Sequence, residues 1–196
     1  MTVLLIVSLA VLAWFLTALL RRYALARSLL DVPNARSSHS LPTPRGGGVA
    51  IVVAFLVGLC LAFFAGQGIA AELFYALLGA GLGIALLGFL DDHGHIAARW
   101  RLLGHFLAAA WALYCLGGLP PLSVFGGLVQ LSWIGDVLAA FYLVWLLNLY
   151  NFMDGIDGIA SVEAICVCLG GALLYVLAEA PATADVSLLM LAAAAL

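Results

Sequence analysis

The sequence predicts an all-α fold, a polytopic bundle of transmembrane helices, and three observations lead to this prediction. First, 66% of the 196 residues are hydrophobic and only 9% are charged, whereas soluble domains are about 45–50% apolar and about 25% charged. Second, the hydrophobic residues form runs that approach the roughly 20 residues needed to cross a bilayer as a helix. Third, short polar turns separate these runs. We therefore expect six full spans and a truncated seventh in one integral membrane domain, residues 1–196.

The first hydrophobic run extends from Thr2 to about Leu20. It has no charged N-terminal region and no convincing cleavage site, so its length suits a retained span better than a signal peptide. Five of the seven arginines lie at the end of this run and in the loop that follows it. Because cytoplasmic loops are enriched in arginine and lysine, we expect this loop to be cytoplasmic and the N-terminus to be periplasmic.

The remaining spans alternate with short turns. The expected spans are residues 49–65, 73–90, 102–116, a run from 134 to the segment that begins at 148, and residues 159–178. The turns at 66–68 and 179–185 contain no arginine, which agrees with a position outside the cytoplasm.

Two segments depart from this regular pattern. Residues 117–133 contain no charged residue and include Pro120 and Pro121, which indicates an external loop with an apolar part at the membrane interface. Asp136 follows near the start of the fifth span, and we assign it no chemistry. The last hydrophobic run, Val186 to Leu196, has only about half the length of a span. We therefore expect the chain to be the front part of a longer protein.

The segment 148–158 carries two amides and two carboxylates between two apolar runs. These residues recur at intervals of three, at Asn148, Asn151, Asp154 and Asp157. On a helix, this spacing can place their oxygen atoms along one face. Carboxylate and amide oxygens are ligands for hard cations, and polar groups beside a bilayer core are usually functional. The segment is therefore a candidate cation site.

The loop 31–48 contains three prolines and three glycines, which exclude a continuous helix. It has two interpretations. The loop is an ordinary basic segment that sets the topology, or it is a phosphate site. In the second case, Gly46 to Gly48 supply bare backbone that can approach a phosphate, and Arg36 and Arg45 donate charge-assisted hydrogen bonds.

A pair of acids, Asp91 and Asp92, ends the third span. Adjacent carboxylates repel each other, and such a pair calls for a proton or a cation. Arg99 and Arg101 follow, and each either extends to the membrane interface beside Trp100 or serves a phosphate. Counting the spans places this acid pair, the loop 31–48 and the segment 148–158 on the cytoplasmic side. Together these clusters favour phosphoryl chemistry with Mg²⁺.

Three motifs in this order and spacing resemble the polyprenyl-phosphate N-acetylhexosamine-1-phosphate transferase family. The motifs are DVPNARSSH at 31–39 with PTPRGG at 42–47, GFLDD at 88–92, and NLYNFMDGIDG at 148–158. The family includes the bacterial enzymes that initiate O-antigen synthesis and the translocase that makes the first lipid-linked peptidoglycan precursor. The loop motif favours the branch that initiates O-antigen.

The resemblance implies transfer of a sugar 1-phosphate from a UDP-N-acetylhexosamine to undecaprenyl phosphate, with release of UMP. It implies Mg²⁺ as the cofactor, with Mn²⁺ as the alternative. The expected location is the bacterial inner membrane, with the active site on the cytoplasmic side. The expected partners are the two substrates and the lipid bilayer, and no nucleic acid is expected. Whether the protein forms a homodimer is left open by the sequence.

The resemblance also assigns site residues by motif matching. The candidate catalytic acids are Asp91, Asp92, Asp154 and Asp157. Asp91 is either the base for the lipid phosphate or a residue that orients it. Asn151 and Asp154 are the candidate metal ligands. The candidate contacts to substrate or phosphate are Arg36, His39, Arg45, Gly46, Gly47, Arg101 and Asn148. A later aspartate and a histidine-rich loop of the family have no counterpart within residues 1–196.

Three other interpretations differ in how well they fit the sequence. A transporter would line a path with intramembrane acids and His105, but most polar groups cluster at one end of the spans, and His105 is expected to be a packed or pore-facing group. A CDP-alcohol phosphotransferase would need the pattern Asp-Gly-x-x-Ala-Arg, which residues 157–161 do not provide. A truncated, non-catalytic remnant of the transferase family stays open.

Overall fold

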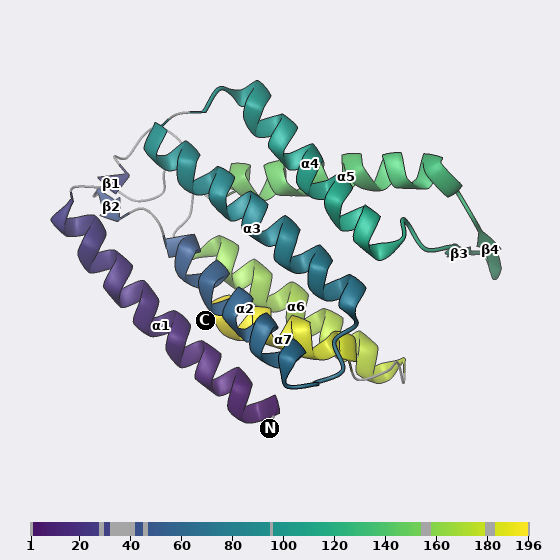
Figure 1. Cartoon of the computed structure of the whole chain (residues 1–196), viewed down its shortest axis with the longest axis horizontal. Helices are drawn as coiled ribbons and strands as arrows, with labels where there is room; N and C mark the ends of the chain where they lie inside the picture. The colour runs from purple at the N-terminus through teal and green to yellow at the C-terminus, as the bar shows by residue number, and fades with distance from the viewer. Residues whose placement is uncertain are drawn as a thin grey trace. The chain divides into compact units, whose positions relative to one another are not determined.

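Seven helices make up most of the computed structural model, which describes residues 2–27, 30–31, 42–44, 47–94, 96–153, 158–178 and 183–195 (Figure 1). The helices are α1 (Thr2–Ala26), α2 (Gly47–Phe64), α3 (Ala71–Gly94), α4 (Ala98–Leu116), α5 (Ser132–Met153), α6 (Ile159–Leu177) and α7 (Thr183–Ala195). Four short strands are β1 (Leu30–Asp31), β2 (Thr43–Pro44), β3 (Leu122–Val124) and β4 (Gly127–Val129). The predicted all-α class is confirmed.

Among the described residues, five helices are long and apolar enough to cross a membrane: α1, α2, α3 as far as Asp91, α5 as far as Phe152, and α6. The 19-residue helix α4 occupies the place of the expected fourth span, but it does not belong to this group. Arg99 and Arg101 lie in its first turn and lower its hydropathy. The membrane-helix fold is therefore confirmed, whereas the count of six spans and the orientation of the chain stay predictions.

One compact unit comprises residues 1–70 and 152–196. Within it, α1 packs against α2 and α7, and α6 packs against α7 (Figure 1). Small residues allow these helices to approach closely, because Ala13, Ala54 and Ala194 form a buried cluster. Leu9 is fully buried, and a Cβ atom added to Gly58 would collide with it. Small residues at helix contacts are typical of membrane bundles.

The second compact unit comprises residues 71–151 and contains α3, α4 and α5 as far as Asn151. Trp111 on α4 lies over Gly79 on α3, and its indole Nε1 donates a hydrogen bond to the backbone oxygen of Tyr75 at 2.9 Å. Helix α4 meets α5 through Phe106 and Phe141, whose rings pack edge to face with centroids 5.2 Å apart.

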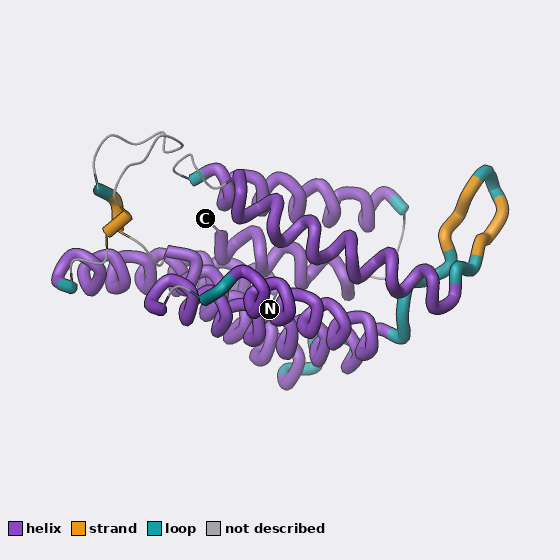
Figure 2. Tube along the Cα trace, turned by 90° about the horizontal axis from the view of Figure 1, so that it is seen from above, coloured by secondary structure: helices purple, strands orange, loops and turns teal. Residues whose placement is uncertain are grey.

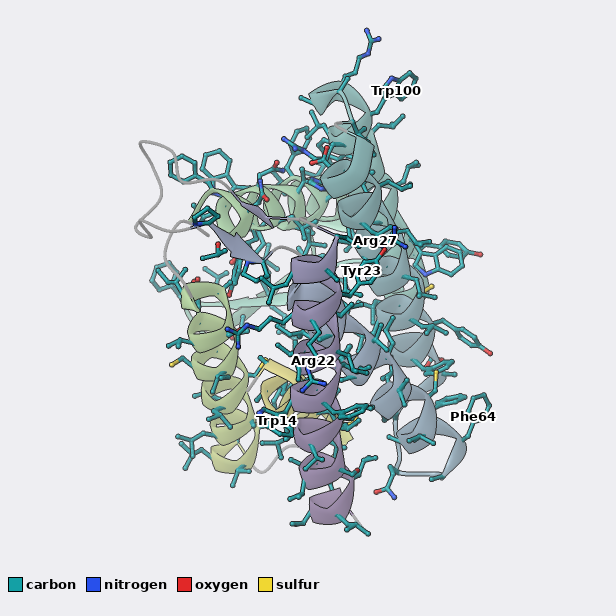
Figure 3. All side chains as sticks on the ribbon, turned by 90° about the vertical axis from the view of Figure 1, so that its left-hand side faces the viewer. Trp14, Arg22, Tyr23, Arg27, Phe64 and Trp100 are labelled. Carbon is teal, nitrogen blue, oxygen red and sulfur yellow. The ribbon has the colours of Figure 1, made fainter. Side chains whose placement is uncertain are left out.

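Many large apolar side chains point outward from the helices. Trp14 on α1 is 71% exposed, and Trp145 on α5 is 70% exposed. Figure 3 shows Phe64 and Trp100 extending away from the helices that carry them. Soluble monomers rarely expose apolar patches of this extent, whereas lipid-facing helices require them. The exposure pattern therefore agrees with a membrane location.

A β-hairpin occupies part of the segment that the sequence predicted as an external loop. Strands β3 and β4 pair antiparallel, with Leu122 opposite Val129 and Val124 opposite Gly127. The hairpin projects beyond the ends of α4 and α5 (Figure 2). At its base, the Asp136 Oδ1 atom accepts a hydrogen bond from the backbone nitrogen of Leu119 at 2.7 Å. Asp136 therefore holds the start of the hairpin segment to the N-terminal part of α5.

Candidate functional site

The Asp91 carboxylate lies near the end of α3 and connects this helix to α4. Its Oδ2 atom accepts a hydrogen bond from Arg101 Nη1 at 2.8 Å, and its Oδ1 atom accepts one from the backbone nitrogen of Ile96 at 2.9 Å. Both side chains of this ion pair are partly exposed. A pair in such a position stabilises a fold by only about 0.2–1 kcal/mol. The main effect of the pair is therefore to orient Asp91.

The two arginines at the start of α4 have different contacts. The Arg99 guanidinium lies over the ring of Trp100, 5.7 Å from its centroid. This is the arrangement expected of an arginine at the membrane interface. Arg101 instead turns toward Asp91. Arg99 therefore fits the interpretation of an arginine at the membrane interface. Arg101 does not, because it contacts an acid of the candidate site.

A second polar contact joins α4 to α5. The Nδ2 atom of Asn148 donates a hydrogen bond to the backbone oxygen of Val144 at 2.8 Å and lies 3.3 Å from His105 Nδ1. His105 is only 9% exposed, so it is a packed side chain, as one of the two sequence interpretations expected. Burying an imidazole is costly unless it has a polar partner, and Asn148 is positioned to be that partner.

The two contacts lie at the same end of this unit. Arg101 precedes His105 by four residues and therefore shares its face of α4, one turn away. His105 contacts Asn148 near the end of α5, whereas Leu119, just after α4, bonds to Asp136 near the start of α5, so α4 and α5 run antiparallel. Asn151 lies one turn beyond Asn148 and is exposed. Asp91, Arg101 and Asn151 consequently lie toward the same end of α3, α4 and α5.

Helix α5 ends at Met153, so Asn148 and Asn151 share a helix. Asp154 and Asp157 lie outside the described residues, and the prediction that all four oxygen donors share one helix face stays a prediction. The next described residue, Gly158, has a φ of 79° and precedes α6. This left-handed backbone conformation favours glycine.

Other predicted site residues are placed only in part. Arg36, His39, Arg45 and Gly46 lie outside the described residues, and Asp92 falls within α3 while its side chain lies outside them. Gly47 begins α2, and a Cβ atom added there would have nothing within 4 Å. The bare backbone proposed for a phosphate is thus open at a helix N-terminus, where N–H groups favour anions. The pairing of Leu30 with Pro44 and of Asp31 with Thr43 brings the two ends of the loop together.

Sequence reasoning missed three of the contacts that shape this unit. The partners in the pairs Asp91 and Arg101, His105 and Asn148, and Leu119 and Asp136 lie 10, 43 and 17 residues apart. Only the first pair carried a signal, because opposite charges flank a short turn. The other two depend on how α4 and α5 pack against each other.

No group of three or more histidine, cysteine, aspartate or glutamate residues in the described part of the chain is arranged to hold a metal ion. The donor that the structure does place at this end of α5 is the amide of Asn151, which is exposed. Amide and carboxylate oxygens suit Mg²⁺ better than Zn²⁺. The chemistry of the predicted ligand pair, Asn151 and Asp154, therefore fits Mg²⁺.

Comparison with known proteins places these residues in a family. The family model described as glycosyl transferase family 4 matches residues 73–196. The chain belongs to glycosyl transferase family 4. The match covers all of α3 to α6 apart from the first two residues of α3, and it confirms the resemblance that the motifs indicated.

Three curated relatives illustrate this membership in glycosyl transferase family 4. An undecaprenyl-phosphate alpha-N-acetylglucosaminyl 1-phosphate transferase of Thermotoga maritima is 27% identical over 78% of this chain and 45% of its own length. A decaprenyl-phosphate N-acetylglucosaminephosphotransferase of Mycobacterium leprae is 29% identical over 82% and 43%. A phospho-N-acetylmuramoyl-pentapeptide-transferase of Streptococcus pneumoniae is 32% identical over 69% and 43%. The chain thus spans less than half the length of each relative.

Proposed function

We propose that this chain forms part of a membrane enzyme that transfers a sugar 1-phosphate from a UDP-N-acetylhexosamine to undecaprenyl phosphate and releases UMP. The names of the relatives support the proposal, because two of these names include both a polyprenyl phosphate and N-acetylglucosamine. We further propose that the product serves cell-envelope polysaccharide synthesis of the O-antigen type. The site is proposed to face the cytoplasm, which the arginine-rich loop after α1 supports.

The observation that carries the proposal is the pairing of Asp91 with Arg101 at the end of a membrane helix, in the same unit and at the same end as Asn151. Phosphoryl transfer depends mainly on positioning the reactants and on stabilising negative charge. An oriented carboxylate and guanidinium and an exposed amide at a membrane interface are groups of this kind. Their substrate would have a lipid part in the bilayer and a phosphate at its surface.

In the proposed reaction, an oxygen of the lipid phosphate attacks the sugar-bound phosphorus of the nucleotide sugar. A new bond forms between this oxygen and the phosphorus, and the bond from the phosphorus to the bridging oxygen breaks. The bridging oxygen and its electron pair leave with UMP. The sugar stays attached to its own phosphate, so the product carries a diphosphate between the lipid and the sugar.

We propose that Asp91 orients the lipid phosphate and does not act as its base. Both carboxylate oxygens already accept a hydrogen bond from the protein, which fixes the side chain. Asp92, Asp154 and Asp157 are proposed as the further acids of the site. Arg101 and the loop residues Arg36, His39, Arg45, Gly46 and Gly47 are proposed to contact phosphate groups or substrate.

Asn151 and Asp154 are proposed to hold Mg²⁺. When bound, the ion would neutralise charge on the diphosphate of the nucleotide sugar. Asn148 is proposed to act close to the substrate. Its amide nitrogen already has Val144 and His105 as partners, and these contacts would fix its side chain.

The decisive experiment uses membranes that contain this sequence within its complete reading frame. They are given radiolabelled UDP-N-acetylglucosamine, undecaprenyl phosphate and Mg²⁺, and the lipid extract is examined for a labelled product. UDP-linked N-acetylfucosamine and N-acetylquinovosamine are tested in parallel. We expect a lipid-linked product with one of these donors, together with UMP. If no donor yields labelled lipid, the transferase proposal fails, and a non-catalytic remnant of the family is the better description.

A further inference from the structure

The hairpin β3–β4 exposes apolar side chains and itself carries no charged residue. Every residue of both strands is exposed, and Phe125 at the tip is fully exposed. From residue 102 to residue 135 the sequence contains no acidic residue, lysine or arginine. A hairpin that extended into water would be expected to carry charged residues, because exposed apolar strands tend to aggregate.

The pairing of the two strands sorts their side chains onto two faces. Leu122 lies opposite Val129, and Val124 lies opposite Gly127. Because side chains alternate along a strand, Leu122, Val124 and Val129 share one face, which is entirely apolar. The other face carries Ser123 and its cross-strand partner Leu128. The hairpin therefore has one apolar face and one mixed face.

The tip contains a residue that the turn does not favour. Phe125 has a φ of 50° and Gly126 a φ of 83°, the combination of a type I′ turn, in which asparagine and glycine are preferred. A bulky side chain with positive φ is an outlier. Turn geometry thus gives no reason for phenylalanine at position 125. Its fully exposed ring is available for contact with a surface outside the chain.

The base of the hairpin is held against α5. The Asp136 carboxylate bonds to the backbone of Leu119, and Gly118 has a φ of 90° with Asp136 Oδ1 only 2.5 Å from the position of an added Cβ atom. Glycine therefore permits the close approach that Asp136 needs. These contacts hold the base of the hairpin in a fixed position at the start of a membrane helix.

The length of α5 indicates at what depth in the membrane the base of the hairpin lies. The stretch Ser132–Phe152 has 21 residues, about 30 Å of helix at 1.5 Å per residue, which is the thickness of the hydrocarbon core. Ser132 must therefore lie near the edge of that core. Trp133, which is 69% exposed, lies where tryptophan is enriched in membrane proteins. Since β4 ends at Val129, it is at most about 10 Å from Ser132.

We propose that the hairpin β3–β4 is a membrane anchor whose apolar face and Phe125 tip lie in the boundary between lipid headgroups and acyl chains. The bilayer is the occupant because the length of α5 places the hairpin at that level and because the exposed side chains of the hairpin are almost all apolar. Since the hairpin carries no charge, apolar burial drives the contact, and anionic lipids add little to it.

A photo-crosslinking amino acid tests this proposal in the full chain in native membranes. Benzoylphenylalanine is placed singly at position 124, 125 or 123, and adducts are identified by mass spectrometry after irradiation. At position 125 the substitution keeps an aromatic side chain, and position 123 is the matched control on the other face. We expect phospholipid adducts at 124 and 125 several-fold above those at 123. Equal lipid labelling at all three positions, or adducts mainly between two copies of the chain, overturns the proposal.

A second variant separates insertion from folding. Phe125→Asn suits the type I′ turn better than phenylalanine does, so the hairpin should keep its structure while it loses the apolar tip. With the crosslinker at position 124, we expect this substitution to lower the lipid adducts several-fold at unchanged protein yield. Lipid adducts at the original level would show that the tip does not enter the bilayer.

Discussion

At the scale of single residues, Asp91 has partners from two segments of the chain. Arg101 supplies a charged donor from α4, and Ile96 supplies a backbone donor from the connection between α3 and α4. The energetic contribution of a partly exposed ion pair is small, about 0.2–1 kcal/mol. Its geometric contribution is larger, because an oriented carboxylate can position a reactant. The two contributions can be separated by mutation.

Asp91→Asn should lower transferase activity by roughly 100-fold, the scale of effect expected from misplacing a reacting group. The stability of the protein should change by no more than about 1 kcal/mol. Labelled lipid product and thermal unfolding in detergent measure the two quantities. Arg99→Gln is the matched control, because Arg99 contacts Trp100 and not Asp91. A large loss of stability in Asp91→Asn would assign the residue a structural role.

The contact between His105 and Asn148 is open to a double-mutant cycle. His105→Leu keeps the approximate volume of the side chain but removes the polar partner of the Asn148 amide, so we expect a loss of roughly 1 kcal/mol of stability. Combined with Asn148→Leu, the coupling energy should reach at least about 0.5 kcal/mol. A coupling of zero would mean that the two side chains are only neighbours.

At the scale of elements, close contact between α3 and α4 depends on glycine at particular positions. Gly79 lies under the indole of Trp111, and any Cβ atom there would collide with the ring. Gly83, one turn later on the same helix, has nothing within 4 Å of that position. The two glycines look alike in the sequence, and the packing of the helices distinguishes them.

This difference gives a matched pair of variants. Gly79→Ala should destabilise the protein by about 1–3 kcal/mol, because overpacking forces the indole and its bond to the Tyr75 oxygen to move. Gly83→Ala should be neutral or stabilising by about 0.5–1 kcal/mol, since alanine is the better helix former. Thermal unfolding in detergent compares the two. Equal effects of both substitutions would contradict the packing of α3 against α4.

At the scale of the whole molecule, hydropathy predicted most of the fold. The expected span at 49–65 corresponds to α2, Gly47–Phe64, and the expected span at 73–90 corresponds to α3, which continues to Gly94. Apolar runs of this length have few alternatives to a helix in lipid. The hairpin β3–β4 was not predicted. Both of its faces are apolar apart from Ser123, so its strands lack the alternation of polar and apolar residues that would indicate a strand. The site was predicted as a set of residues, whereas contacts such as that of His105 with Asn148 depend on the packing of α4 against α5.

The metal dependence of the proposed enzyme is a test at this same scale. Removal of divalent cations with EDTA should abolish formation of lipid-linked sugar, and Mg²⁺ should restore it, because the predicted ligands are oxygen donors. Mn²⁺ should restore it in part, whereas Zn²⁺ should not. Product formation in extensively chelated membranes would argue against a metal in the reaction.

The ion pair between Asp91 and Arg101 also has a consequence for how the protein enters the membrane during synthesis. Arginine within a helix disfavours insertion by the translocon, by up to about 2.5–3.5 kcal/mol at the helix centre and less near its ends, and α4 carries two in its first turn. Because one of them pairs with the end of α3, the two helices should insert together as a helical hairpin. In a glycosylation-based insertion assay, α4 alone should therefore insert less efficiently than α4 preceded by α3, and Asp91→Asn should reduce that advantage.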